Sequence, residues 1–149
     1  MVWAGRHKSG ERGANLVEFA ILAPLLILLL FGIIEFGWLF GQYNDVRHGA
    51  REGARFAAVN AGDNAAVLDS VCSAMEGLTA GMSSIDVSWT DGAIVGSQSQ
   101  ITVTANVTSL SGLPLITTFL PNQLTSTVTF RLEQPSALWA PSGPVSCPL

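Results

Sequence analysis

Hydrophobic residues are concentrated in one long run near the start of the chain. Between Phe19 and Phe40 there are fifteen Leu, Ile or Phe residues and a single charged residue, Glu35. Each of these apolar side chains favours membrane insertion by about 0.3 to 0.6 kcal/mol, and together they outweigh one acidic residue near the end of the run. The 27 residues from Ala14 to Phe40 would form about 40 Å of helix, enough to cross the hydrocarbon core. The pattern predicts a membrane-spanning helix. The alternative, a cleaved secretory signal, is disfavoured by the length of the run and by the lack of a small-x-small cleavage site behind it.

The helical pattern continues beyond the apolar run, as far as residue 60. Small residues form one stripe, at Gly37, Gly41, Gly49, Gly53 and Ala57, and arginines form another, at Arg47, Arg51 and Arg55. Glycines at this spacing let helix backbones approach closely. We expect them either to pack against a helix of another chain or to seat this helix on its own globular domain, and both interpretations stay open. The arginines are expected to face solvent or lipid headgroups.

The periodicity changes after a short loop at residues 60–64. Apolar residues at three- and four-residue steps, from Val67 to Leu78, predict an amphipathic helix capped by Asp63 or Asn64 and ended by glycines. Three runs then alternate between apolar and polar residues, at 85–89, 101–107 and 124–132. They predict an antiparallel sheet of about three strands with helix on one face, and Asp91-Gly92 predicts a hairpin between the first two. The fold class is therefore α+β, and a long helix followed by a small antiparallel sheet resembles the outline of pilin-like folds.

Two segments of the second half have no regular pattern. We expect the apolar segment 109–121 to cover an open end of the core, the alternative being an exposed contact patch for another subunit. The tail, 135–149, contains four prolines and is expected to be extended. A disulfide between Cys72 and Cys147, the only cysteines, would staple this tail to the second helix in an oxidising compartment. The alternative is a buried Cys72 with Cys147 free in the tail.

Length and charge narrow the classes of function. A chain of 149 residues, 12% of them charged, accommodates one anchored helix and one compact domain. Residues 1–60 have a net charge of +1 (six Lys/Arg, five Asp/Glu), whereas residues 61–149 have −5 (one Arg, six Asp/Glu). That acidic half lacks the clustered bases that phosphate contacts need, so we expect no nucleic-acid partner. Both histidines lie outside it, and no Cys-x-x-Cys or phosphate-binding glycine loop is present. We therefore predict no enzymatic activity, no cofactor and no metal site.

Glu18 is an acidic residue near the start of the predicted membrane helix. An ionised carboxylate at the centre of such a helix costs about 2.5 to 3.5 kcal/mol, so we expect a compensating group unless Glu18 lies at the headgroup boundary. The segment from Gly13 to Phe19, a glycine, four residues and then Glu-Phe, resembles a prepilin cleavage site. Cleavage after Gly13 would free an amine on Ala14, which a neighbouring subunit could present to Glu18.

Glu35 lies near the far end of the apolar run. Three surroundings are expected for a carboxylate in that position: solvent, an arginine, or a contact with another helix. The last of these would make Glu35, like Glu18 and the glycines of the small stripe, a helix-to-helix contact.

A wider resemblance extends from residue 11 to about residue 58. The segment from Glu11 to Leu26, the segment Gly32-Ile-Ile-Glu-Phe-Gly37, and the Arg-x-x-Ala repeat that ends at Ala58 resemble the N-terminal domain of TadE-like proteins. These are minor pilins or pseudopilins of the tight-adherence (Flp, type IVc) pilus. Beyond residue 60 the resemblance rests on the general outline and on Arg131-Leu-Glu133 near the end of the last strand pattern.

The resemblance implies a division of the chain and a set of partners. Residues 1–13 would be a leader peptide, 14–60 a transmembrane and juxtamembrane helix, 61–134 an extracytoplasmic domain and 135–149 a Pro-rich tail. The implied partners are other pilins and pseudopilins, a prepilin peptidase, the inner-membrane assembly platform and membrane lipid. The implied role is pilus assembly by helix-helix association. The alternatives are a membrane-anchored assembly factor that stays out of the fibre and an anchored binding module.

The distribution of charge does not decide which end of the membrane helix faces the cytoplasm, because three Lys/Arg precede the apolar run and three follow it closely. No folded domain precedes residue 13, and a prepilin peptidase acts at the cytoplasmic face. We therefore expect a single-pass protein of the bacterial inner membrane, with its N-terminus in the cytoplasm and its domain outside.

Overall fold

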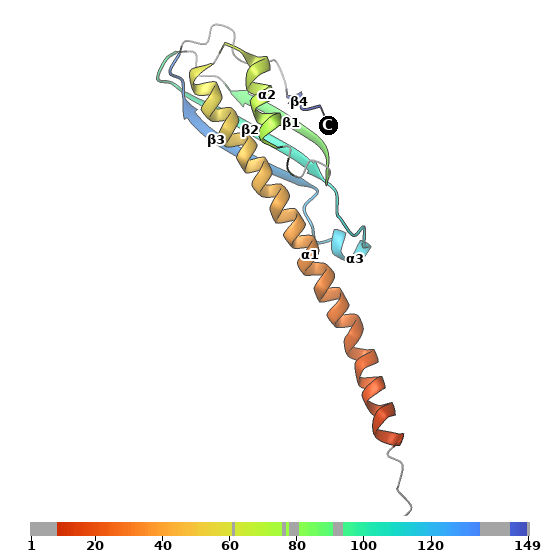
Figure 1. Cartoon of the computed structure of the whole chain (residues 1–149). Coiled ribbons are helices and arrows are strands. Elements are labelled where there is room, and N and C mark those ends of the chain that lie inside the picture. Colours follow the sequence, from red (N-terminus) through yellow and green to blue (C-terminus); the bar gives the residue numbers. More distant parts are fainter. Residues whose placement is uncertain are drawn as a thin grey trace, which may run out of the picture.

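The computed structural model describes residues 9–60, 62–75, 77, 81–90, 94–134 and 144–148. Its first element, α1 (Ser9–Val59), is one continuous helix that includes Pro24. Figure 1 shows the first half of α1 projecting away from a small domain, and its second half packed into that domain. The predicted fold class, α+β with a long N-terminal helix that continues into the domain, is confirmed.

The second helix, α2 (Asn64–Ala74), begins where the capping signal predicts. The carboxylate of Asp63 accepts a hydrogen bond from the Ala66 N–H at 3.0 Å, which satisfies one of the free donors at the helix start. The helix ends at Ala74, earlier than its apolar pattern suggests, and the Met75 N–H bonds back to the Cys72 carbonyl. Leu78, the last residue of the pattern, lies outside the described residues.

The sheet has four antiparallel strands in the order β3-β2-β1-β4. The three predicted runs form β1 (Met82–Thr90), β2 (Gln98–Val107) and β3 (Gln123–Arg131). The fourth strand, β4 (Val145–Ser146), comes from the tail and pairs with Asp86 and Val87 of β1. The tail was expected to be extended but not to add a strand. The predicted Asp91-Gly92 turn and residues 135–143 lie outside the described residues.

The core lies between the sheet and the two longer helices, which cover the same face of it (Figure 1). The inward positions of β1 and β2 are fully or nearly fully buried: Ile85, Val87, Trp89, Ile101, Val103 and Ala105. The opposite face carries hydroxyl pairs between neighbouring strands, such as Thr102 with Thr127 at 3.1 Å. The predicted alternation, apolar inside and polar outside, is confirmed.

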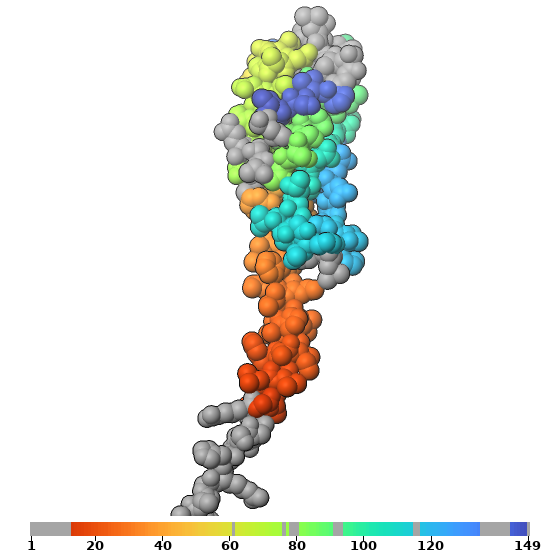
Figure 2. Space-filling model, turned by 90° about the vertical axis from the view of Figure 1, so that its right-hand side faces the viewer, coloured from red at the N-terminus to blue at the C-terminus, as the bar shows by residue number. Residues whose placement is uncertain are grey.

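The segment 109–121 does not have the role that the sequence predicts for it. It includes the short helix α3 (Pro114–Thr117). We call it the α3 loop. It was predicted to cover an open end of the core, but its apolar side chains Leu110, Leu113 and Phe119 are 55%, 42% and 77% exposed. Figure 2 shows the loop, in cyan, lying against the orange part of α1. The core does not need this cover, because α1 and α2 already close the inner face of the sheet.

Candidate functional site

The first half of α1 is apolar and unburied. The most apolar window of 18 residues in Gly13–Val59 has a mean hydropathy of 2.7, and none of it is buried inside the fold. A core helix of a soluble domain would instead be covered by its own chain. The helix is thus long and apolar enough to span a membrane, and its surface is free to contact lipid or other helices.

The predicted processing residues lie on this projecting half. Gly13, Ala14, Glu18 and Phe19 are all exposed and helical, and nothing from the domain lies within 4 Å of a Cβ built on Gly13. Any partner of Glu18 outside its own helix therefore has to come from another molecule.

Glu35 lies where α1 enters the domain. Its side chain is 1% exposed. The Leu110 N–H donates to its Oε1 at 2.7 Å, and the Ser111 N–H donates to its Oε2 at 3.0 Å. A carboxylate out of water requires such donors to offset its lost hydration, and bonds to an ionised acceptor are about twice as strong as neutral ones. We call this arrangement the Glu35 clasp.

The clasp depends on the backbone of the α3 loop. Two successive N–H groups converge on one carboxylate, as in the backbone nests that bind anions. The chain turns directly afterwards at Gly112, whose φ is +63°, a left-handed conformation that glycine adopts without the steric cost paid by other residues. The loop can therefore place both donors on Glu35 and still return toward α3.

The α3 loop was not among the partners that the sequence predicts for Glu35. Solvent, arginine and another helix were the expected surroundings, whereas the structure binds Glu35 to a loop 75 residues further along the chain. The charge-free, apolar composition of the α3 loop was visible in the sequence, but no local pattern connects it to position 35.

A cavity of about 250 Å³ lies beside the clasp. It is lined from α1 by Glu35, Trp38 and Gln42, and from the other side by Thr108, Ser109 and Asn122. These groups are neutral except for one carboxylate that already accepts two hydrogen bonds. Over the described residues, no group of three or more His, Cys, Asp or Glu is placed to hold a metal ion.

The glycine stripe divides into two parts with different surroundings. A Cβ built on Gly49 would lie closer than 3.0 Å to the Met75 side chain, and one built on Gly53 would lie equally close to Cγ2 of Val71. These two glycines therefore let α1 pack against α2 of the same chain. A Cβ on Gly37 would meet nothing within 4 Å, so Gly37 stays a candidate for contacts between chains, whereas Gly41 is half-buried.

The arginine stripe points away from the core, as expected. Arg47 lies over the ring of Tyr43 at 5.5 Å from its centroid, which is within cation-π range, and Arg51 is exposed. Arg55 donates to the Glu52 carboxylate through Nε at 3.1 Å, and this hydrogen bond lowers the pKa of Glu52 below 4.5.

The lowered pKa of Glu52 predicts a pH-dependent stability difference. Because the folded pKa is depressed, the stabilisation by the pair is complete above pH 4.5 and is lost as the pH falls through the folded value. A Glu52→Gln variant should be slightly less stable than the wild type at pH 7, since exposed pairs contribute little, and the difference should shrink as the pH is lowered below 4.5. Urea denaturation at pH 7 and at a pH below 4.5 measures the difference. If the difference in stability between wild type and variant were the same at both pH values, the lowered pKa of Glu52 would be contradicted.

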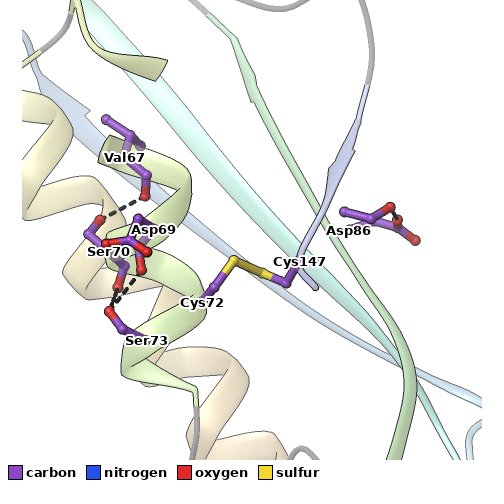
Figure 3. Close-up of a disulfide and its surroundings, with 8 residues drawn as sticks. Val67, Asp69, Ser70, Cys72, Ser73, Asp86 and Cys147 are labelled. Atoms are coloured by element: carbon purple, nitrogen blue, oxygen red, sulfur yellow. Dashed lines mark hydrogen bonds between the residues drawn. A yellow bond between two sulfur atoms is a disulfide. The ribbon is translucent and has the colours of Figure 1, made fainter. Parts of the chain in front are cut away.

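Cys72 and Cys147 are joined by a disulfide, with their Cα atoms 5.7 Å apart. Figure 3 shows the bond running from Cys72 on α2 to Cys147, directly after β4 at the edge of the sheet. Next to it, the Ser146 hydroxyl donates to the Asp86 carboxylate at 2.7 Å, and the Cys147 N–H donates to the Ile85 carbonyl at 2.9 Å. The end of the tail is thus fixed to both layers of the domain.

Fold and site define the class of protein: an α+β domain on a helix that is long and apolar enough to cross a membrane. Residues 13–55 match the family described as TadE-like protein. The matched segment lies within α1 and contains Glu18, Glu35 and the stripe from Gly37 to Gly53, and it leaves α2 and the sheet outside. It confirms the resemblance to the TadE-like family, which implies a Tad pilus-associated protein. Comparisons with curated proteins and with solved structures gave no match.

Proposed function

We propose that this chain is a minor pilin or pseudopilin that takes part in the assembly of a tight-adherence (Flp, type IVc) pilus. The observation that carries the proposal is the projecting half of α1, which is apolar from Phe19 to Ile34 and is not covered by the described part of its own domain. Such a helix is suited to lipid before assembly and to neighbouring helices afterwards. The TadE-like match over the same segment supports this assignment.

The proposed topology places the N-terminus in the cytoplasm, α1 across the inner membrane and the domain outside. The disulfide between Cys72 and Cys147 fits an oxidising extracytoplasmic compartment. A prepilin peptidase would cut after Gly13, and mass spectrometry of the natural protein should then find Ala14 at its start. A chain that still begins at Met1 would contradict this step.

The proposed assembly mechanism uses Glu18 as a selector of register. The amine freed on Ala14 of one subunit would pair with Glu18 of its neighbour, because a carboxylate in the bilayer is costly and a positive partner would offset its charge. Gly37, which has open space around it, and Gly41 would then let the two helices approach closely.

Replacing Glu18 by Ala should abolish or strongly reduce pili while leaving cleavage and insertion intact. The exposed position of Glu18 means that its own fold loses no contact, so the defect should come from pairing between subunits. The measurements are pilus yield after shearing, N-terminal mass and membrane fractionation. Glu18→Gln should behave like Glu18→Ala, because the amide has no charge, whereas the control Asn15→Ala should assemble normally. Normal pili from both Glu18 variants would refute the mechanism.

Two other functions are separable from this one. A membrane-bound assembly factor would be required for pili but missing from sheared fibres. An anchored binding module would function without N-terminal processing. Immunodetection of the chain in sheared pili, together with a Gly13 variant that blocks cleavage, distinguishes the three.

A further inference from the structure

The α3 loop presents an apolar surface without charge. None of the residues 109–121 is Asp, Glu, Lys, Arg or His, and Leu110, Leu113 and Phe119 are directed outward rather than into the core. Exposed leucine and phenylalanine in a neutral segment mark a surface that is covered by another apolar partner.

The clasp fixes the level of this surface along α1. Leu110 and Ser111 are bonded to Glu35, and the apolar, exposed surface of α1 runs through this level, from Ile33 and Ile34 to Phe36 and Phe40. From Leu16 to Glu35 the helix rises about 30 Å, which matches the thickness of the hydrocarbon core. Trp38, one turn beyond, lies at the level where aromatic side chains collect at membrane interfaces.

We propose that the α3 loop is a second membrane contact, which lies in the outer interface of the bilayer crossed by α1. Leu110, Leu113 and Phe119 contact lipid there, and Glu35 holds the loop at that depth. The inference rests on the part of the proposed function that places α1 across a bilayer. Lipid is the partner because the exposed side chains continue the lipid-facing surface of α1, and because a charge-free loop suits zwitterionic lipid without requiring anionic headgroups.

A second contact would restrict the orientation of the domain. A single helix in a bilayer can tilt and rotate, and interfacial anchors are what limit both motions. With the loop in the interface on one side of α1, the domain would present a fixed face to incoming subunits.

The test uses the full chain in phosphatidylcholine vesicles with a spin label at Phe119→Cys. The matched control is a label at Ile94→Cys, because Ile94 is also apolar, is 72% exposed and lies next to residues bonded to Leu132, at the end of the domain away from the clasp. Mass spectrometry checks that each protein carries one label and retains the bond between Cys72 and Cys147. Electron paramagnetic resonance then compares accessibility to oxygen, which concentrates in lipid, with accessibility to a water-soluble nickel complex.

The ratio of oxygen to nickel accessibility should be several-fold higher at position 119 than at position 94. Equal ratios at the two positions would overturn the proposal. Spin-spin broadening at position 119 that disappears on dilution with unlabelled chain would also overturn it, because a second copy would then be the partner. Loss of the chain from the vesicles in alkaline carbonate would refute the anchor itself and with it the proposed topology, whereas a retained chain with an aqueous label refutes only the loop contact.

Glu35→Gln in the labelled chain tests the role of the clasp. The amide keeps the size of the side chain but replaces one acceptor oxygen with a donor, so one of the two bonds to the loop is lost. The ratio at position 119 should fall toward the value at position 94, which itself should stay unchanged and so report an intact domain. The control Glu52→Gln, the same change on the part of α1 that lies within the domain, should leave both ratios unchanged. An unaltered ratio at position 119 in Glu35→Gln would overturn the holding role of Glu35.

Discussion

Replacing both Cys72 and Cys147 by serine is expected to lower the free energy of unfolding of the domain by about 4 kcal/mol, because the disulfide closes a long loop in the unfolded chain. The two cysteines are 75 residues apart in the sequence. Without the disulfide, the end of the tail would be held on β1 by two paired positions and by the hydrogen bonds of Ser146 and of the residue 147 backbone, so it should separate from the sheet more readily. Urea denaturation of the full chain in detergent micelles, followed by near-ultraviolet circular dichroism, measures the loss.

Reduction provides the control for this prediction. A reductant should destabilise the wild type by about the same amount and leave the double serine variant unchanged. Ser73→Ala, a change at an exposed position next to Cys72, should have an effect below about 0.5 kcal/mol. A double variant as stable as the wild type would show that the bond contributes nothing to the folded domain.

Gly53→Val is expected to destabilise the domain by about 3 kcal/mol, because overpacking a well-filled core forces side chains and backbone to shift. The added Cβ would overlap Cγ2 of Val71, and Ile101 Cδ1 lies 3.5 Å from it. Val71 is fully buried and adjoins the disulfide-bonded Cys72, so α2 has little freedom to move away. The measurement is the same denaturation experiment.

Gly37→Val is the matched change on the same helix. Open space surrounds Gly37, and valine is a better helix former than glycine, so stability should fall by less than about 0.5 kcal/mol. The same variant should reduce pilus yield if Gly37 contacts a neighbouring helix. A stable Gly37→Val that assembles normally would remove Gly37 from the proposed contact, and a fully stable Gly53→Val would contradict the packing of α1 against α2.

Features that depend on residues close together in the sequence could be predicted from it. The apolar run of α1, the cap at Asp63 and the alternation in β1, β2 and β3 each follow from short-range periodicity, and the structure contains all of them. Residues 13–55 likewise carried enough local pattern for the TadE-like resemblance.

Features that depend on distant parts of the chain could not be predicted in the same way. β4 is two residues long, and its pairing with Asp86 joins segments that share no repeat or turn signal. The Glu35 clasp uses backbone N–H groups. Almost every residue type has such a donor, so the sequence does not show which residues will provide it. The spacing of the glycine stripe also does not reveal what each glycine contacts. Gly49 and Gly53 pack against α2, whereas Gly37, in the same stripe, faces open space.

The continuity of α1 has a mechanical consequence. One helix of 51 residues supplies both the apolar stem and core residues such as Val46, Ala50 and Ala54, with no linker between them. In the proposed pilus, tension on the stem would therefore act directly as shear between α1 and the sheet. The disulfide joins α2 to the end of β4 and does not bridge α1 to the sheet, so the non-covalent packing of α1 resists this shear first.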